Sequence, residues 1–216
     1  MRDLAALRRE YADEGLTESD LDPDPVAMFR RWFDEVDAAG VHEPNAMVVA
    51  TVSADGQPSS RMVLLKGVGD DGFVFFTNTA SRKGEELAAN PRCSLLFPWH
   101  PLERQVRIDG TAEPLSHERV TEYFDSRPRG SRIGAHASHQ SRPVAGRAEL
   151  QAAYDKLTAR YDGAEVPVPE EWGGYLVRPG TIEFWQGRPG RMHDRLVYRR
   201  AVEGAGDGWR TERLAP

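Results

Sequence analysis

Near the C-terminus, two positively charged side chains flank a histidine, which can transfer a proton. Arg191, His193 and Arg195 occupy alternate positions, shortly after Trp185. Alternate residues of a β-strand point to the same face, so a strand here would place two guanidinium groups and an imidazole together. Arginine grips phosphate through paired hydrogen bonds and also stacks on aromatic rings. The pattern therefore predicts a site for a flat anionic ligand, such as a phosphorylated aromatic cofactor or substrate.

Composition narrows the class of protein. The chain has 216 residues and a formal net charge of -6, which argues against general affinity for nucleic acid. No apolar run approaches the roughly 20 residues that cross a bilayer, and the N-terminus lacks the apolar stretch of a secretory signal. Cys93 is the one cysteine and cannot form an internal disulfide, which agrees with a reducing compartment. We therefore expect a cytoplasmic protein without membrane or nucleic-acid partners.

Hydrophobic spacing predicts the elements that must position this chemistry. Apolar residues at helical spacing predict a helix that begins at Asp24-Pro25 and ends near Gly40. Further helices are expected over 81–89, 116–126 and 147–161, with a polar loop over 127–143. Strands are expected over 46–53, 59–66, 73–77, 93–99, 104–114, 174–185, 191–200 and 209–214. These elements indicate an α+β, mostly antiparallel barrel with peripheral helices.

Two further cations stand at the start of a predicted helix. Ser81 is placed to cap the helix, and Arg82 and Lys83 follow in its first turn. Cations oppose the helix dipole there, whereas a bound phosphate would use both the cations and the free N–H groups. The alternative is two solvated basic residues at a helix start.

Arg61 and Lys66 lie five residues apart on an otherwise apolar predicted strand. That spacing sends them to opposite faces, so one ligand meets both only at a bulge or at the strand's end. Charges that protect an edge strand are the alternative. On the strand over 104–114, Gln105 shares a polar face and could reach the carbonyl and imide groups of a flavin ring, or simply be solvated.

Tyr123, Arg127 and Ser131 recur every four residues and could form a phosphate cradle. The alternative is a helix end at which Arg127 complements the dipole. His136 and His139 have no third ligand at suitable spacing, so no metal site is predicted. Glycine fingerprints of nucleotide-triphosphate enzymes and serine hydrolases are also missing from the sequence.

Five motifs occur in the order found in one flavoprotein family. They are 61–66 (Arg-Met-Val-Leu-Leu-Lys), 81–83 (Ser-Arg-Lys), 140–141 (Gln-Ser), 185–187 (Trp-Gln-Gly) and 191–195 (Arg-Met-His-Asp-Arg). From about Leu7 to Pro216 the chain resembles the pyridoxine/pyridoxamine 5'-phosphate oxidase family. The resemblance implies a split β-barrel homodimer with FMN in each of two clefts at the subunit interface. It also implies an N-terminal segment over 1–20, whose mobility stays open, and one domain over 21–216 whose strand meander from about 172 to 216 lies at the interface.

The resemblance further implies roles for individual residues. It assigns FMN contacts to Arg61, Met62, Val63, Leu64, Leu65, Lys66, Phe76, Thr77, Arg82, Lys83, Gln105, Gln140, Ser141, Trp185 and Arg195. It assigns the substrate phosphate to Lys66, Tyr123, Arg127 and Ser131. Arg191 and His193 are the implied catalytic pair that positions the pyridine ring, and Arg8 and Tyr11 are further substrate contacts.

The implied activity is part of vitamin B6 metabolism. A hydride would move from C4' of pyridoxamine or pyridoxine 5'-phosphate to N5 of FMN, giving pyridoxal 5'-phosphate, with O2 as the acceptor that forms H2O2 and with ammonia released from the amine. The alternatives are a related flavin oxidase for another aromatic substrate, such as a phenazine precursor, and a non-catalytic FMN or pyridoxal phosphate carrier. Phe76 stands where relatives can have Tyr, and the acidic segment 15–20 puts a secondary product site in doubt.

Overall fold

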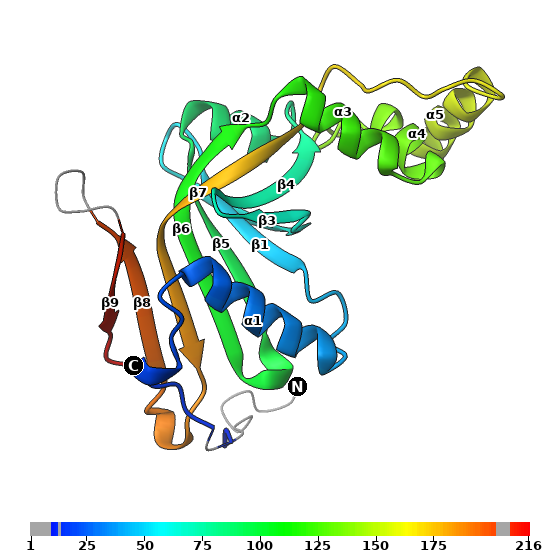
Figure 1. Ribbon diagram of the computed structural model, residues 1–216. Coiled ribbons are helices and arrows are strands. Elements are labelled where there is room, and N and C mark those ends of the chain that lie inside the picture. The colour runs from blue at the N-terminus through cyan, green and yellow to red at the C-terminus, as the bar shows by residue number, and fades with distance from the viewer. Residues whose placement is uncertain (1–9, 13, 202–207) are drawn as a thin grey trace.

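A computed structural model describes residues 10–12, 14–201 and 208–216 (Figure 1). Within these residues nine strands form one sheet, and every pair of neighbouring strands is antiparallel. The strands are β1 (Ala46–Val52), β2 (Pro58–Leu64), β3 (Gly67–Gly69), β4 (Gly72–Asn78), β5 (Arg92–Trp99), β6 (Arg104–Pro114), β7 (Trp172–Gln186), β8 (Asp194–Arg200) and β9 (Trp209–Arg213). Their order is β2-β1-β5-β6-β7-β4-β3, and β8 pairs with both β7 and β9.

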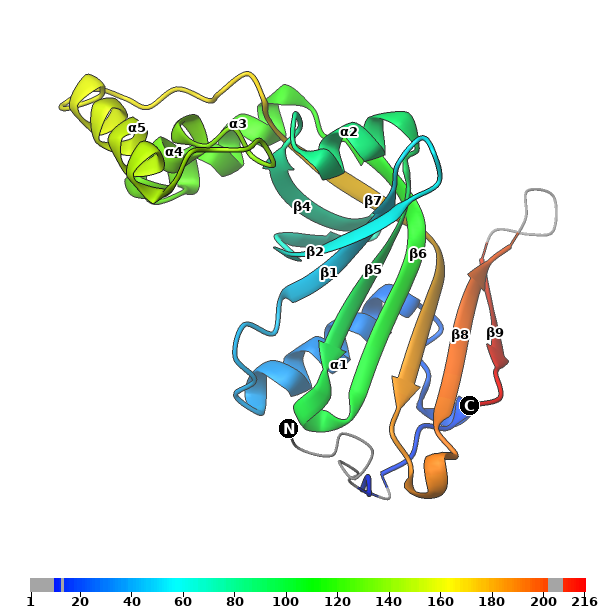
Figure 2. The ribbon, with the colours of Figure 1, turned by 180° about the vertical axis from the view of Figure 1, so that it is seen from behind.

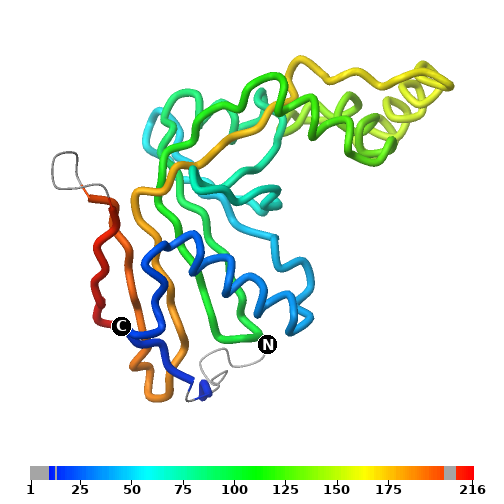
Figure 3. The backbone as a smooth tube through the Cα atoms, viewed as in Figure 1, coloured from blue at the N-terminus to red at the C-terminus, as the bar shows by residue number. Residues whose placement is uncertain are grey.

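The helices lie around this curled sheet (Figure 2). They are α1 (Pro25–Ala38), α2 (Arg82–Ala89), α3 (His117–Ser126), α4 (Arg129–Ala137) and α5 (Arg147–Arg160). The backbone trace shows that α3, α4 and α5 form an arm that projects away from the sheet (Figure 3). None of the helices in the described part of the chain is long and apolar enough to cross a membrane.

Helix α1 fills the concave side of the sheet with aromatic rings. Asp24 caps the helix by accepting a hydrogen bond from the Val26 N–H at 2.9 Å. Phe29 packs edge-on against Phe97 and Trp32 packs edge-on against Phe184, with ring centroids 4.9 and 5.1 Å apart. Burial of each such side chain stabilises the fold by roughly 1.5–3 kcal/mol, so α1 is part of the core.

The two long strands β6 and β7 separate a buried face from a half-buried one. Val106, Phe184 and Leu196 lie directly opposite one another across β6, β7 and β8, and all three are fully buried. The neighbouring row on the other face consists of Gln105, Trp185 and Arg195. The alternation predicted for 104–114 is therefore confirmed.

Residues 127–143, expected to be a loop, contain helix α4, so that prediction is wrong. Ile133 of this helix is 2% exposed and packs into a small core with Phe124 and Val166. The sequence offers one large apolar side chain in this helix, which is too weak a periodic signal; its tertiary partners stabilise the helix instead.

The strand expected from Arg191 begins only at Asp194. Pro189, Gly190 and Arg191 form a 3-10 turn in which Gly190 and Arg191 have φ values of 63° and 62°. The prediction that Arg191, His193 and Arg195 share one strand face is therefore wrong. The left-handed backbone at the turn is not visible as a periodic pattern, although Pro-Gly is a turn signal.

Candidate active site

The start of α2 is built directly against the loop that precedes it. The Ser81 side chain accepts the Gly84 N–H, as predicted for a cap, at 3.4 Å. A Cβ on Gly84 would lie 2.1 Å from the carbonyl oxygen of Thr79, so only glycine permits this approach. The packing draws Lys83 inward, and that residue is 7% exposed.

The ammonium group of Lys83 is surrounded by neutral oxygens. It donates to Gln140 Oε1 at 2.6 Å, to Thr77 Oγ1 at 2.9 Å and to Ser81 Oγ at 3.4 Å. Burial, together with the nearby Arg61 guanidinium, lowers the pKa of Lys83 to about 8. A buried charge is costly unless an opposite charge pairs with it. The arrangement therefore fits an anion supplied by a ligand, and FMN carries such an anion in its phosphate.

Arg61 and Arg82 complete what we call the cationic cluster, which is Arg61, Arg82 and Lys83. The Arg61 guanidinium donates to the hydroxyls of Thr51 and Ser59, and its side chain is 21% exposed. It is thus held at the sheet end of α2, beside Lys83.

The rest of the segment 61–66 shows why the five-residue spacing of Arg61 and Lys66 does not send them to opposite faces of one strand. Strand β2 ends at Leu64, and Lys66 is exposed just beyond it, with its N–H donating to Val74 O at 2.8 Å. Its side chain is therefore not bound to either face of β2. Met62 is 65% exposed, whereas Leu65 is buried; Val63 and Leu64 are half-buried.

The arm contributes a second basic region. Phe76 of β4 stacks on Tyr123 of α3, with ring centroids 3.8 Å apart and planes 10° apart, and burial raises the pKa of Tyr123. The Arg127 guanidinium lies 4.1 Å from the Trp172 ring, and its Nη1 is buried without a hydrogen bond to any described residue. Such an orphaned donor suits a phosphate oxygen. Ser131 is exposed on α4.

At the far end of β7 lies an aromatic cluster, defined as Tyr11, Trp185 and His193. The His193 ring is 4.7 Å from Trp185 and 5.5 Å from Tyr11, between ring centroids. A Cβ on Gly187 would lie 3.0 Å from Tyr11 Cγ, so the glycine allows the ring to lie over the chain. His193 Nδ1 accepts the Arg188 backbone N–H at 3.1 Å, which places the proton of a neutral ring on Nε2.

Arg195 borders this cluster in a fixed orientation. Its Nε and Nη2 donate to the two carboxylate oxygens of Glu183, both at 3.0 Å, and these bonds raise the pKa of Arg195. Gln105 lies across the β6–β7 ladder from Trp185. Arg191 is exposed on the preceding turn, and Arg8 lies outside the described residues.

The structure thus divides the predicted site residues into the cationic cluster at α2, the arm residues Tyr123, Arg127 and Ser131, and the aromatic cluster at the turn between β7 and β8. Helix α2 is at one end of the sheet, and the turn between β7 and β8 is at the opposite end (Figures 1 and 2). Sequence reasoning did not single out Glu183 or Glu86, which are 2% and 4% exposed. In the sequence, Glu183 is an acidic residue within an otherwise apolar strand, on the same face as Trp185, and Glu86 forms an Arg–Glu pair with Arg82 at i,i+4 spacing.

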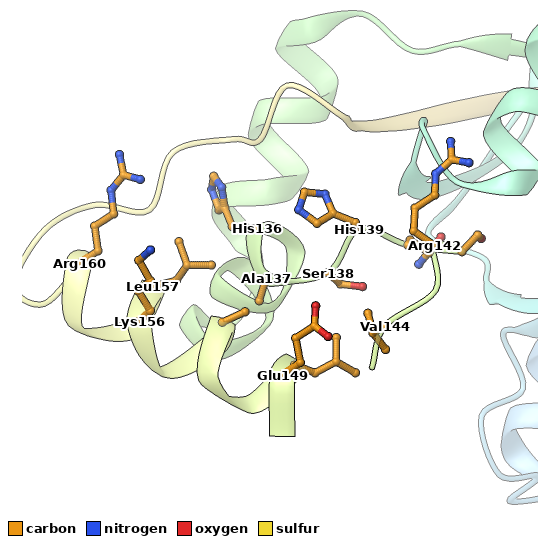
Figure 4. A pocket seen from close by; sticks show the side chains of 14 residues that line it. His136, Ala137, Ser138, His139, Arg142, Val144, Glu149, Lys156, Leu157 and Arg160 are labelled. Carbon is orange, nitrogen blue, oxygen red and sulfur yellow. The ribbon is translucent and has the colours of Figure 1, made fainter. Parts of the chain in front are cut away.

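A cavity of about 490 Å³ lies between α4, the loop 138–144 and α5 (Figure 4). Gln140 and Ser141 belong to its wall, so the loop that reaches Lys83 has open space behind it. His136 contacts the Pro167 carbonyl oxygen through Nε2 at 2.7 Å. Among residues 10–12, 14–201 and 208–216, no group of three or more His, Cys, Asp or Glu is arranged to hold a metal.

Two sequence profiles cover most of the chain. One, described as pyridoxamine 5'-phosphate oxidase, matches residues 33–161, and the other, described as the pyridoxine 5'-phosphate oxidase C-terminal dimerisation region, matches residues 172–216. A pyridoxine/pyridoxamine 5'-phosphate oxidase of Nocardioides sp. is 67% identical, over 99% of this chain and 98% of that protein. The chain belongs to the pyridoxine/pyridoxamine 5'-phosphate oxidase family. The namesake enzyme of Rubrobacter xylanophilus is 56% identical, over 100% and 97% of the two chains.

Solved structures share the fold. PhzG from Burkholderia lata, crystallised with tetrahydrophenazine-1-carboxylic acid, is 33% identical with a TM-score of 0.86, over 94% of this chain and 99% of that one. An FMN-binding protein from Nostoc punctiforme related to pyridoxamine 5'-phosphate oxidase is 14% identical with a TM-score of 0.71, over 91% and 100%; it supports the fold alone. The predicted α+β split barrel with peripheral helices is confirmed, and so is the family resemblance.

Proposed function

We propose that the chain oxidises pyridoxamine and pyridoxine 5'-phosphates to pyridoxal 5'-phosphate. With the amine, the overall reaction consumes O2 and water and releases H2O2 and ammonia; with the alcohol, it consumes O2 and releases H2O2. The observation that carries the proposal is the buried ammonium of Lys83 among neutral oxygens, in a chain 67% identical to an enzyme of that name. It supports a resident phosphate-bearing cofactor.

FMN is the proposed cofactor, because this family uses it and because the donors fit. The cationic cluster would bind its phosphate, with Gln140 and Thr77 beside it, and Ser141 follows Gln140 in the same loop. When bound, FMN supplies a ring that accepts a hydride from the substrate. Trp185, Gln105 and Arg195 form one row across β6, β7 and β8 and would border that ring.

A second copy of the chain would supply the missing half of each site. Helix α2, which carries Arg82 and Lys83, and the turn between β7 and β8 lie at opposite ends of one chain (Figure 1), yet the family resemblance assigns residues from both ends to one site. Residues 172–216 match a dimerisation region, which supports a homodimer. We therefore propose that each cleft joins the cationic cluster of one protomer to the aromatic cluster of its partner, with the meander from 172 to 216 at the interface.

The substrate would bind between these groups. Tyr123, Arg127, Ser131 and Lys66 are the proposed ligands of its phosphate, and the orphaned Nη1 of Arg127 supports this. Arg191 and His193 would orient the pyridine ring, since a neutral His193 whose Nδ1 accepts the Arg188 N–H has its proton on Nε2 and can donate it. Tyr11 would cover the ring from the N-terminal segment. The protein thereby contributes orientation and exclusion of water.

A phenazine-precursor oxidase is the nearest competing function, and the similarity to PhzG gives it a specific basis. An aerobic assay with FMN-loaded protein and pyridoxamine 5'-phosphate separates the two. Stoichiometric pyridoxal phosphate and peroxide are expected. A folded yellow protein that forms neither product, with pyridoxine 5'-phosphate failing as well, would overturn the proposal in favour of another substrate or a carrier role.

Mixed dimers test the shared cleft. Lys83→Met damages the cationic cluster and Arg191→Ala the aromatic end, so each homodimer should be weak. Refolding the two together should restore about a quarter of wild-type activity, because half of the dimers are mixed and each has one intact cleft. If both clusters acted within one chain, mixing would restore nothing.

Two further features stay proposals. We place residues 21–216 in one domain because a single sheet contains β1 through β9. A reducing cytoplasm is the proposed compartment, supported by Cys93, which is buried; burial raises the pKa of its thiol to about 12.

A further inference from the structure

Beneath the cationic cluster lies a buried carboxylate, that of Glu86 on α2. Glu86 is 4% exposed, and its side chain points from the helix toward β1 and β2. Its Oε1 accepts Arg82 Nε at 2.8 Å, and its Oε2 lies 3.4 Å from Arg61 Nη2. One carboxylate therefore contacts both arginines of the cluster.

Two hydroxyls also connect Glu86 to Arg61, through hydrogen bonds that are shorter than the direct contact. Thr51 and Ser59 face each other across the β1–β2 ladder. Each accepts a hydrogen bond from Arg61 and donates one to Glu86 Oε2, the latter at 2.6 Å for Ser59. This chain of hydrogen bonds fixes the direction of every donor: guanidinium to hydroxyl, then hydroxyl to carboxylate. A glutamine at position 86 would bring an N–H₂ group into a place that needs acceptors.

The protonation state of Glu86 agrees with its role as a hydrogen-bond acceptor. Burial alone would raise its pKa, but the hydrogen bonds from Ser59, Thr51 and Arg82 lower the pKa to about 2. The carboxylate is therefore ionised throughout the physiological range. Three cations and one carboxylate leave two positive charges in the set, which matches a phosphate monoester dianion.

We propose that Glu86 is a positioning residue that holds Arg61 and Arg82 in the orientation needed to bind the FMN phosphate. It acts through Thr51 and Ser59 on the first and directly on the second. The inference rests on the proposed placement of that phosphate at the start of α2. A purely electrostatic role predicts the opposite sign, because a carboxylate near a phosphate repels it.

Binding titrations with FMN and riboflavin test the proposal on the whole protein, since the two ligands differ only by the phosphate. For Glu86→Gln we expect the dissociation constant of FMN to rise by about tenfold and that of riboflavin to stay within about twofold, as expected for loss of hydrogen bonds to charged groups. Glu118→Gln, an exposed residue on α3, is the charge-matched control and should change neither constant.

Three results would contradict the inference or the phosphate site on which it rests. Tighter FMN binding in Glu86→Gln would mean that the carboxylate only repels the phosphate, and an unchanged ratio of the two constants would mean that it only stabilises the fold. Arg82→Ala is the separate check on the placement: if it leaves the ratio unchanged, the phosphate is not at α2 and the proposed site fails first.

Ser59→Ala keeps the test usable if Glu86→Gln does not fold. Ser59 is half-buried, and the substitution removes one hydroxyl from the chain while Glu86 stays in place. We expect FMN binding to weaken by about threefold, with riboflavin unchanged, from the loss of one hydrogen-bonded link. Equal effects on both ligands would overturn the inference.

Discussion

The cationic cluster and the aromatic cluster are built on different kinds of structure. Arg61, Arg82 and Lys83 lie on a strand and in the first turn of a helix, and side-chain oxygens of residues in helices and strands accept their hydrogen bonds. Tyr11 and His193 lie outside helices and strands, and contact Trp185 through ring faces and edges. A phosphate needs fixed donors, whereas ring packing tolerates small shifts. We infer that the first region anchors the cofactor and that the second adapts to the substrate.

The largest expected effect that distinguishes the roles of the two clusters is that of Lys83→Met on FMN binding. Loss of the buried ammonium should weaken FMN binding by about a hundredfold, because truncating a buried charge pair costs several kcal/mol. The ligand-free protein should melt no earlier than the wild type, since a buried charge among neutral partners stabilises little. Flavin fluorescence and thermal melting measure the two effects.

Lys156→Met, on the arm, is the matched control and should bind FMN normally. If Lys83→Met weakens the binding of FMN and of riboflavin by the same factor, the loss is not specific to the phosphate, and the cationic cluster is not the anchor.

Arg191→Ala should give the converse result. We expect kcat/KM for pyridoxamine 5'-phosphate to fall by about thirtyfold, with kcat and KM both affected, because alignment strengthens toward the transition state. The affinity for FMN should be unchanged. Arg147→Ala, exposed on α5, serves as the control in steady-state assays. Unaltered kinetics would remove Arg191 from the site.

The pH dependence of FMN binding should come from Lys83. Its pKa in the ligand-free protein is lowered to about 8, and a bound phosphate favours the protonated form. Affinity should thus be full below pH 8 and fall by up to about tenfold per unit above it. The ligand-free fold should gain stability over the same rise, because the unfolded chain holds the proton up to the ordinary lysine pKa of about 10.4.

Parallel titrations with riboflavin supply the reference for this effect, since ionisation of the ring affects both ligands. Identical pH curves for FMN and riboflavin would exclude Lys83 as the titrating group, and Lys83→Met should abolish the difference between the curves.

The sequence predicted the parts of this comparison that depend on local pattern. The alternation around Gln105 placed it on the half-buried face, and Ser81 was correctly predicted to cap the helix that carries Lys83. Motif order identified the family. The assigned roles of individual residues stay predictions until the variants are measured.

The remaining features depend on tertiary contacts that no local pattern contains. Helix α4 depends on Ile133 reaching Phe124 across the arm, and the turn at Arg191 depends on a left-handed backbone. No local pattern in the sequence indicates that Glu86 is buried. Its burial arises only because β1 and β2 bring Thr51 and Ser59 beneath α2.

The smallest expected effect lies at the proposed substrate phosphate site, on the arm. Tyr123→Phe removes a hydroxyl but keeps the stack on Phe76, whose ring centroid is 3.8 Å away. We expect KM for pyridoxamine 5'-phosphate to rise about threefold to fivefold with kcat unchanged, since one hydrogen bond made equally in substrate and transition state is lost. Tyr154→Phe, which removes a hydroxyl from α5 of the same arm, is the matched control and should change neither constant. A lowered kcat, or a loss of FMN in Tyr123→Phe, would place this hydroxyl on the cofactor or the reacting atoms, and the division between anchoring and adapting regions would then have to include the arm.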